Sequence, residues 1–560
     1  MGRRTVLAGI LACVLGTLVV VTAGRLPGAP EPALLSVAAD RWARLGALGV
    51  AAGGFAFALR APAVGGAIAV AAACCVGALT AFAAPPIVAI MSGLALLLPA
   101  LVLIVRGRSR ASVVAGAWTS VCVVVASVVA SWGYGFMYGA THPSSTAAGP
   151  PHGATLWVWS GGVTSTSAVV TATLERPDGQ ATLRVSPPAE VATERDGEVV
   201  RFRLSRLRPG GRVEYAVLVN GHDDGSGHGA FRTVPSGASS FTIAFSSCAR
   251  TGSNGAVFDA IRAEDPLMYF NLGDLYYADI TGPDTRRFSR AFDRVLTRPA
   301  QANLYRSTST TYVWDDHDFG GNDADGTSRS APAAHAVYRR LVPHHAFAIA
   351  GPRAPLARAF SAGRVRFIVT DTRSARSPGG QPDGPGKSML GPAQRAWLEA
   401  ELLAARDRFP VIVWVNPDPW IGAPRDGADG WAGYATERAE LARFIADNAI
   451  TGLVMLSGDT HAVALDDGTN TGYAGDGRRG FPLLHAGALD RAPQHNGGPY
   501  SHGEFLGGGQ YGTLEIEDDG GPMVSVTLRG HDWQGNELTS LRLQFAVPRG
   551  GGSRSGAPNQ

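Results

Sequence analysis

The chain has 560 residues and a formal net charge of +3, with hydrophobic residues at 45% of its positions. Such a length exceeds one compact domain, so we expect two or three domains. The positive charge gathers before residue 135, which leaves 40 basic and 44 acidic residues in the rest of the chain. A mildly acidic main part argues against a nucleic-acid-binding surface, which needs a concentrated basic stripe.

The N-terminal region contains long apolar stretches that are typical of membrane helices. They run approximately over 5–23, 45–59, 63–83, 87–105 and 112–132, and all but the second approach the roughly 20 residues that cross a hydrocarbon core. Arg3, Arg4 and the arginines after the second and fourth stretches place the N-terminus in the cytoplasm. We therefore predict a transmembrane domain of about five spans over 1–135, a multi-pass cell-membrane location and an extracytoplasmic catalytic part. If the second stretch does not insert, four spans remain and the catalytic part would lie in the cytoplasm.

Residues 136–154 are rich in Pro, Gly and Ser and predict a linker. From 155 to 235 apolar residues alternate with period two, and Gly- or Pro-containing turns separate the runs, which is typical of a small β-sandwich. The turn at 207–210 and the strand after it resemble a fibronectin-type-III module. The segment contains no catalytic constellation, so we expect a structural role.

The segment from 240 to 548 mixes strand-like apolar runs with helical stretches, and 549–560 is expected to be a disordered tail. Helical periodicity is clear near 393–406 and 437–449, and the strand-like runs are FTIAFSS, LMYFNL, TYVW, VRFIVT, VIVWV and TGLVML. This mixture predicts an α/β domain with a central sheet. Functional sites in such sheets lie where loops leave the strand ends.

Three acidic motifs follow such strands: Gly-Asp-Leu-Tyr-Tyr at 273–277, Trp-Asp-Asp-His-Asp at 314–318 and Gly-Asp-Thr-His at 458–461. One Asp after a strand is ordinary turn chemistry. Three clusters of carboxylate, imidazole and phenol groups instead favour a metal centre that activates water.

Four residues suit such a centre on their chemistry. We expect Asp274 to bridge two cations, as phosphoester cleavage requires. Asp459 and His461 lie two apart on an extended loop and can share a metal. Asn322 offers a neutral oxygen suited to a hard ion such as Ca²⁺.

Other residues are candidates for the substrate and the proton. Arg373 offers a bidentate fork for phosphate. His317 lies among carboxylates that favour its protonated form, which suits a general acid or a charged phosphate contact. Asp316 is assigned to the catalytic group, as a ligand or as a support for one, and Asp315 is expected to support ligands. Asp418 either touches the site or belongs to a proline-rich turn.

Cys248 is the one cysteine of the chain outside the predicted spans. It has no cysteine partner there for a disulfide. It is therefore either a buried packing residue, as cysteine often is, or a metal ligand.

Five motifs in order, SSCA at 246–249, GDLYY at 273–277, WDDHDFGGND at 314–323, VTDTRSAR at 369–376 and SGDTH at 457–461, resemble the PhoD-like (alkaline phosphatase D) branch of the metallophosphoesterases. The resemblance covers about residues 155–545. It implies a metallophosphoesterase-type α/β/β/α sandwich, in which a cysteine replaces the usual first Asp-x-His metal motif.

The resemblance also implies the metals. A ferric ion would be held by Cys248, Asp274, Tyr277 and His461, and Ca²⁺ would bind through Asp274 toward Asn322 and Asp459. The expected function is hydrolysis of phosphate monoesters or diesters by metal-activated water.

Several alternatives stay open. The same ligands tolerate Zn²⁺ or Mn²⁺, and a non-catalytic, membrane-anchored binding protein with a decayed site is a third hypothesis. The physiological substrate and the oligomeric state cannot be read from the sequence.

Overall fold

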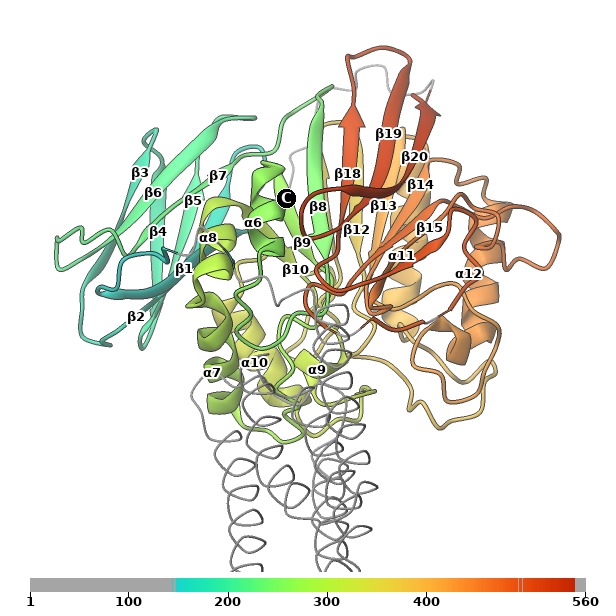
Figure 1. The fold of residues 1–560 in the computed structure, drawn as a ribbon, viewed down its shortest axis with the longest axis horizontal. Helices are drawn as coiled ribbons and strands as arrows, with labels where there is room; N and C mark the ends of the chain where they lie inside the picture. Colours follow the sequence, from blue (N-terminus) through green and yellow to red (C-terminus); the bar gives the residue numbers. More distant parts are fainter. Residues whose placement is uncertain (1–143, 145–147, 492, 496, 549–560) are drawn as a thin grey trace, which may run out of the picture. The chain divides into compact units, whose positions relative to one another are not determined.

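The computed structural model describes residues 144, 148–491, 493–495 and 497–548 of the chain. These residues belong to one compact unit, His142–Gln560. Its elements form two small antiparallel sheets followed by two larger sheets with helices on their outer faces (Figure 1).

The predicted membrane domain, and the multi-pass location that rested on it, are corrected. In the described part of the chain no helix is long and apolar enough to cross a bilayer. The longest described helix, Pro392–Arg406, has 15 residues, fewer than the roughly 20 that a hydrocarbon core requires. The five predicted spans and the predicted tail at 549–560 lie outside the described residues. The described part of the chain is mixed α/β.

The first seven strands form the two small sheets. One has the order β1-β2-β5-β4 and the other β3-β6-β7, and every pairing in them is antiparallel. Val158, Phe202, Tyr215 and Phe231 are buried between them, which explains the period-two alternation of the sequence. The predicted domain limits of 155 and 235 stay a prediction. The strands are β1 (Thr155–Gly161), β2 (Ala168–Leu174), β3 (Ala181–Ser186), β4 (Glu190–Asp196), β5 (Val199–Ser205), β6 (Arg212–Val219) and β7 (His228–Arg232).

The first large sheet has six strands in the order β10-β9-β8-β18-β19-β20. Strands β8, β9 and β10 are parallel, and the other three pair antiparallel. The strands are β8 (Phe241–Ser246), β9 (Met268–Asn271), β10 (Ser309–Tyr312), β18 (Tyr511–Glu517), β19 (Met523–His531) and β20 (Glu537–Ala546).

The second large sheet has seven strands in the order β11-β12-β13-β14-β16-β15-β17, of which β12, β13, β14 and β16 are parallel. The strands are β11 (Arg358–Ala362), β12 (Val365–Val369), β13 (Val411–Asn416), β14 (Leu453–Ser457), β15 (Ala462–Asp466), β16 (Leu483–Ala486) and β17 (Glu504–Leu506).

The two large sheets pack face to face through a fully buried apolar layer. Phe245 and Phe270 of the first sheet share this layer with Phe367 and Leu456 of the second, and the rings of Phe270 and Phe367 are 5.3 Å apart. Since both faces of the parallel strands are covered, their sequences are continuous apolar runs.

Helices cover the outer face of each large sheet. On the first, α7 and α10 pack with Tyr269 of β9 and Tyr312 of β10, and on the second, Leu398 and Leu441 pack with Trp414 of β13. The helices are α6 (Val257–Ala263), α7 (Thr285–Leu296), α8 (Pro299–Ser307), α9 (Asp316–Phe319), α10 (Ala331–Leu341), α11 (Pro392–Arg406) and α12 (Ala435–Asp447).

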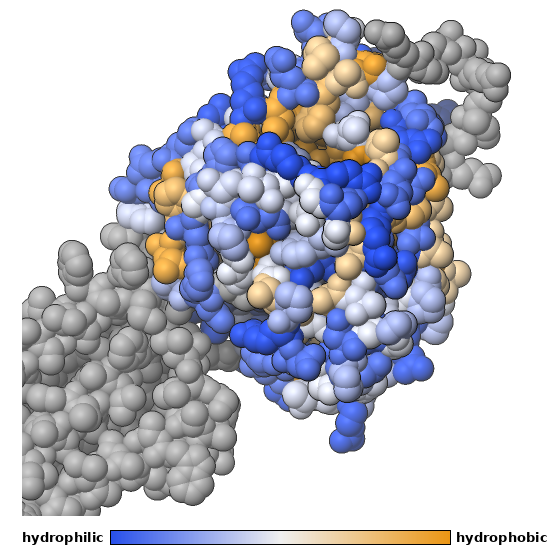
Figure 2. Space-filling model, turned by 90° about the vertical axis from the view of Figure 1, so that its right-hand side faces the viewer, coloured by the Kyte–Doolittle hydropathy of each residue, from blue (hydrophilic) through white to orange (hydrophobic). Residues whose placement is uncertain are grey.

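The surface of the described part is mostly polar. Figure 2 shows one face of it, on which hydrophilic side chains predominate and apolar ones gather toward one end. Among the described residues, Leu506 and Met523 are the large apolar side chains that are exposed, at 45% and 40%. Isolated apolar side chains of this kind are normal on a protein surface.

Candidate metal centre

The predicted metal ligands lie on loops that leave the carboxyl ends of parallel strands in both large sheets. Cys248 follows β8, Asp274 follows β9, and Asp459 and His461 follow β14. Backbone hydrogen bonds join the first two loops, since Cys248 N donates to Gly273 O at 3.2 Å. Asp459 N donates to Ser247 Oγ at 3.2 Å, which connects the second sheet to the first. The site therefore lies at the edge where the two sheets meet.

Four of these residues have left-handed backbone conformations. Their φ values are 66° for Cys248, 53° for Asp274, 63° for Asp459 and 52° for His461. Residues with a Cβ rarely adopt such values, which cost of order 1–3 kcal/mol each. Strain of this kind clusters at functional sites, where the surrounding structure fixes it.

Cys248, Asp274 and His461 converge on one point. Their sulfur, carboxylate oxygen and ring nitrogen lie within 4.8 Å of one another. The Tyr277 hydroxyl is 3.0 Å from His461 Nε2, and the Tyr277 side chain packs against Cys248. The four residues predicted to hold one metal ion are therefore side by side, with a thiol, a carboxylate, a phenol and an imidazole.

A band of carboxylates extends from this point. Asp274 is close to Asp316 and His317, and two further groups bring carboxylate oxygens within 4.8 Å of one another. These groups are Asp315, Asp418 and Asp459, and Asp316, Asp323 and Asp429.

Three oxygens in this band suit a cation. Oδ2 of Asp274, of Asp315 and of Asp418 are each buried and have no hydrogen-bond partner. Leaving such groups unpaired is costly, and a divalent cation with oxygen ligands would satisfy them. The donor set therefore fits a metal on both sides of Asp274.

Crowding shifts the protonation of these acids. Burial, followed by the charge of Asp316, raises the pKa of Asp274 to about 6, although the His317 charge opposes the shift. Burial and neighbouring carboxylates also raise the pKa of Asp459 well above its ordinary value. The pKa of the Cys248 thiol is raised by burial and then by Asp274 and Asp459. A cation bound by these groups would compete with the protons that their raised pKa values favour.

His317 lies at the start of α9, beside the acidic band. Its Nδ1 is 2.5 Å from Asp279 Oδ1, and its ring centre is 4.1 Å from that of Tyr277. Burial lowers its pKa, but the carboxylates of Asp316, Asp274 and Asp279 outweigh burial and raise the pKa to about 10. His317 is therefore a cation at neutral pH, as predicted from its acidic neighbours.

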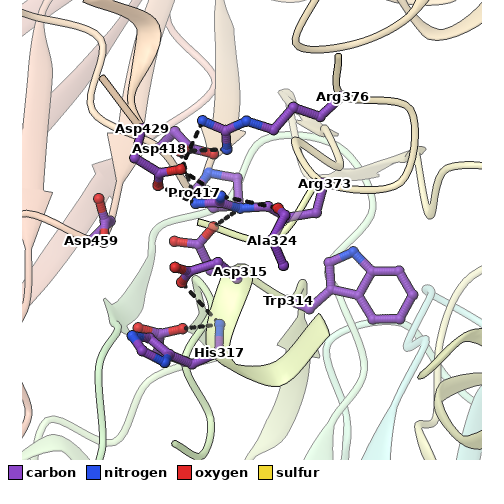
Figure 3. Close-up of polar contacts among 12 residues, drawn as sticks. Trp314, Asp315, His317, Ala324, Arg373, Arg376, Pro417, Asp418, Asp429 and Asp459 are labelled. Carbon is purple, nitrogen blue, oxygen red and sulfur yellow. Dashed lines mark hydrogen bonds and ion pairs between the residues drawn. The ribbon is translucent and has the colours of Figure 1, made fainter. Parts of the chain in front are cut away.

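Arg373 is fully buried, and carboxylates surround it (Figure 3). Its Nε donates to Asp315 at 2.5 Å, and its two Nη atoms donate to Asp429 at 2.8 and 2.6 Å. The remaining donors reach Asp418 Oδ1 at 3.0 Å and Ala324 O at 3.4 Å. All five guanidinium N–H groups thus have protein acceptors, so Arg373 holds the acidic band together instead of presenting a fork to phosphate.

The sequence prediction missed Asp429 and left Asp418 open. Asp429 lies in the loop between β13 and α12, and no strand-like run precedes it. Its role follows from its ion pairs with Arg373 and Arg376, which no local pattern announces. Asp418 follows β13 directly and pairs with the same two arginines.

Asn322, predicted as a ligand, has an exposed side chain. Its neighbour Asp323 lies nearer to the acidic band, because Asp323 N donates to Asp316 Oδ2 at 2.7 Å. The structure thus brings together every other predicted metal ligand, and Asn322 stays a prediction.

Comparisons with known proteins agree with this fold. Residues 243–481 match the family model described as PhoD-like phosphatase. The chain is 26% identical over 315 residues to "Alkaline phosphatase D" of Bacillus subtilis (strain 168), which is 47% of this chain and 53% of the relative. The chain thus spans about half the length of the curated relative it matches. A solved structure, "Structure of PhoD", has a TM-score of 0.56 and 16% sequence identity, and the match covers 72% of this chain and 95% of that chain.

Two mixed sheets with acidic loops at their shared edge are the fold that the chain shares with the solved PhoD structure. Residues 243–481 of the chain match the PhoD-like phosphatase model, which confirms the family resemblance seen in the sequence.

Proposed function

We propose that the protein hydrolyses phosphate esters, as a metal-dependent phosphomonoesterase or phosphodiesterase. The observation that carries this proposal is the convergence of Cys248, Asp274 and His461 within 4.8 Å, with Tyr277 against them. Asp274 also faces the acidic band, so its carboxylate is the group that two cations would share.

We assign Fe³⁺ to Cys248, Asp274, Tyr277 and His461, because thiolate and phenolate ligands suit a trivalent ion. Ca²⁺ is assigned to the acidic side of Asp274, where Asp459 supplies an oxygen, and Asn322 stays a proposed ligand there. Zn²⁺ or Mn²⁺ at the same ligands is the alternative.

Bound cations of this kind lower the pKa of water and neutralise phosphate oxygens. The other requirement is a proton for the leaving alkoxide, and His317 holds one at neutral pH. Its Nδ1 is held by Asp279, which leaves Nε2–H as the donor. His317 therefore acts as the general acid.

Asp316 positions His317 and the acidic band. Its Oδ1 accepts from His317 N at 2.9 Å, and its Oδ2 accepts from Asp323 N at 2.7 Å. Arg373 compensates the charge of two buried carboxylates, Asp315 and Asp418, and of the half-buried Asp429, which keeps the three in one place.

A metal-reconstitution assay tests the proposal. The purified chain is stripped with chelator, reloaded with Fe³⁺ and Ca²⁺ or with Zn²⁺ or Mn²⁺, and assayed on p-nitrophenyl phosphate and bis-p-nitrophenyl phosphate. We expect turnover of at least one ester only after metal is restored. Equal turnover by stripped and reloaded protein, or none with any metal, would reject the function.

A further inference from the structure

A positively charged side chain that binds the substrate's phosphate group has not yet been assigned at this centre. Phosphoryl transfer needs positive charge close to the transferred group, and arginine is the side chain that matches phosphate oxygens in pairs. Arg373 does not meet this need, since it is fully buried and its charge is offset by Asp315, Asp418 and Asp429. Arg376 is likewise buried and donates to Asp418 and to Tyr434.

Arg491 lies on the other side of the centre. Its guanidinium carbon is 3.7 Å from the ring centre of Tyr277, whose hydroxyl is 3.0 Å from His461 Nε2. His317 contacts the same ring at 4.1 Å. The Arg491 guanidinium therefore lies against a ring whose hydroxyl is directly beside the converging metal ligands.

The loop that carries Arg491 connects β16 to β17 and is bonded to both ligand loops. Leu489 N donates to Ser247 O at 3.1 Å, and Gln494 N donates to His461 O at 3.4 Å. The neighbouring Asp490 accepts from the backbone and side chain of Arg250. These contacts fix the backbone of Arg491 relative to Cys248 and His461, while its side chain is half-buried and so reaches solvent.

We propose that Arg491 binds the phosphate group of the substrate and favours monoesters over diesters. The inference rests on the proposed phosphoesterase function. A phosphate monoester carries up to two negative charges on its terminal oxygens and a diester carries one, so the guanidinium of Arg491 stabilises the monoester more strongly. The cation–π contact with Tyr277 holds the guanidinium flat in that position.

The test compares the full chain with Arg491→Met, Arg491→Lys and a control, Arg408→Met. Arg408 is an exposed arginine that likewise lies above an aromatic ring, that of Phe409, at 5.6 Å, but it precedes β13 and so lies at the opposite edge of the sheet. Calorimetry measures the affinity for inorganic phosphate, kinetics give KM and kcat for a monoester and a diester, and elemental analysis gives the metal content.

Losing one charge-assisted contact should weaken phosphate binding, and raise the monoester KM, roughly 10- to 100-fold in Arg491→Met. The diester KM should change less, Arg491→Lys should recover part of the loss, and Arg408→Met should match the wild type. Metal content should be unchanged. Wild-type phosphate affinity in Arg491→Met, or a loss of affinity that follows a loss of metal, would overturn the assignment.

The two proposals fail separately. Wild-type protein that binds phosphate through Arg491 but cleaves neither ester would support the binding role and reject hydrolysis. Ester cleavage with an unchanged monoester KM in Arg491→Met would support hydrolysis and reject the binding role of Arg491.

Discussion

At the scale of single residues, the site depends on side chains whose charge is set by neighbours. His317 is a cation because Asp316, Asp274 and Asp279 outweigh its burial. Asp274 holds its proton up to about pH 6 because it is buried beside Asp316. Both pKa values are raised, and perturbed pKa values of adjacent groups are typical of functional sites.

His317→Ala should lower kcat about 10²- to 10⁴-fold on an alkyl phosphate, because the leaving alkoxide then lacks its acid. The loss should be much smaller on p-nitrophenyl phosphate, whose leaving group is stable without a proton. Steady-state kinetics on both esters give the comparison. An equal loss on the two substrates would show that His317 does not donate the proton.

At the scale of elements, the centre exists because loops from two sheets touch. Gly458, between β14 and Asp459, is the contact point: a Cβ there would lie 2.9 Å from Leu272 O and from Ser247 Oγ. Since Leu272 O is backbone at the end of β9, the second sheet's loop would have to move away from the first.

Gly458→Ala should therefore reduce metal content and activity together while the domain stays folded. Gly380→Ala is the matched control, because a Cβ at this exposed glycine meets nothing within 4 Å. Elemental analysis, activity and circular dichroism give the answer. A Gly458→Ala protein with full metal content would show that the loop contact is not needed.

The arrangement of strands and loops explains which parts of the centre the sequence could predict and which it could not. Strand runs followed by Cys248, Asp274 and Asp459 predicted the loops of the centre, because carboxyl ends of parallel strands share an edge. The partners of Arg373 were not predictable, since Asp315, Asp418 and Asp429 come from three separate segments. An arginine that binds phosphate and an arginine buried among carboxylates, as Arg373 is, cannot be distinguished by their local sequence.

The predicted membrane helices rested on apolar length in residues 1–135 and on the arginines between the stretches. They lie outside the described residues, among which no helix has the length and hydropathy of a span. The β-strands at 155–232, in contrast, follow from period-two alternation with turn residues between, and this local pattern was sufficient to find them.

At the scale of the whole molecule, metal binding and folding are coupled. Cations bind deprotonated carboxylates, so they compete with the proton that Asp274 keeps up to about pH 6 and with those on Asp315 and Asp459, whose pKa values are also raised. The folded-state pKa of Asp274 lies above its ordinary value of 3.8. The metal-free fold is therefore stabilised by protons that are lost as pH rises through about 6.

The increase in Tm on adding metal should accordingly be larger at about pH 8 than at about pH 5. At a metal concentration a thousandfold above Kd the stabilisation is about 4 kcal/mol. Buried histidines such as His485, whose pKa is lowered by burial, titrate in both samples and cancel in the difference. Thermal unfolding with chelator and with metal at each pH measures it, and a larger increase at the lower pH would contradict the account.

The most direct test of the shared metal centre is the turnover of p-nitrophenyl phosphate by folded Asp274→Ala protein beside the wild type. Asp274 faces both the Cys248–His461 group and the acidic band, so its loss should remove metal from both and abolish turnover while circular dichroism stays unchanged. Wild-type turnover in folded Asp274→Ala protein would contradict the account.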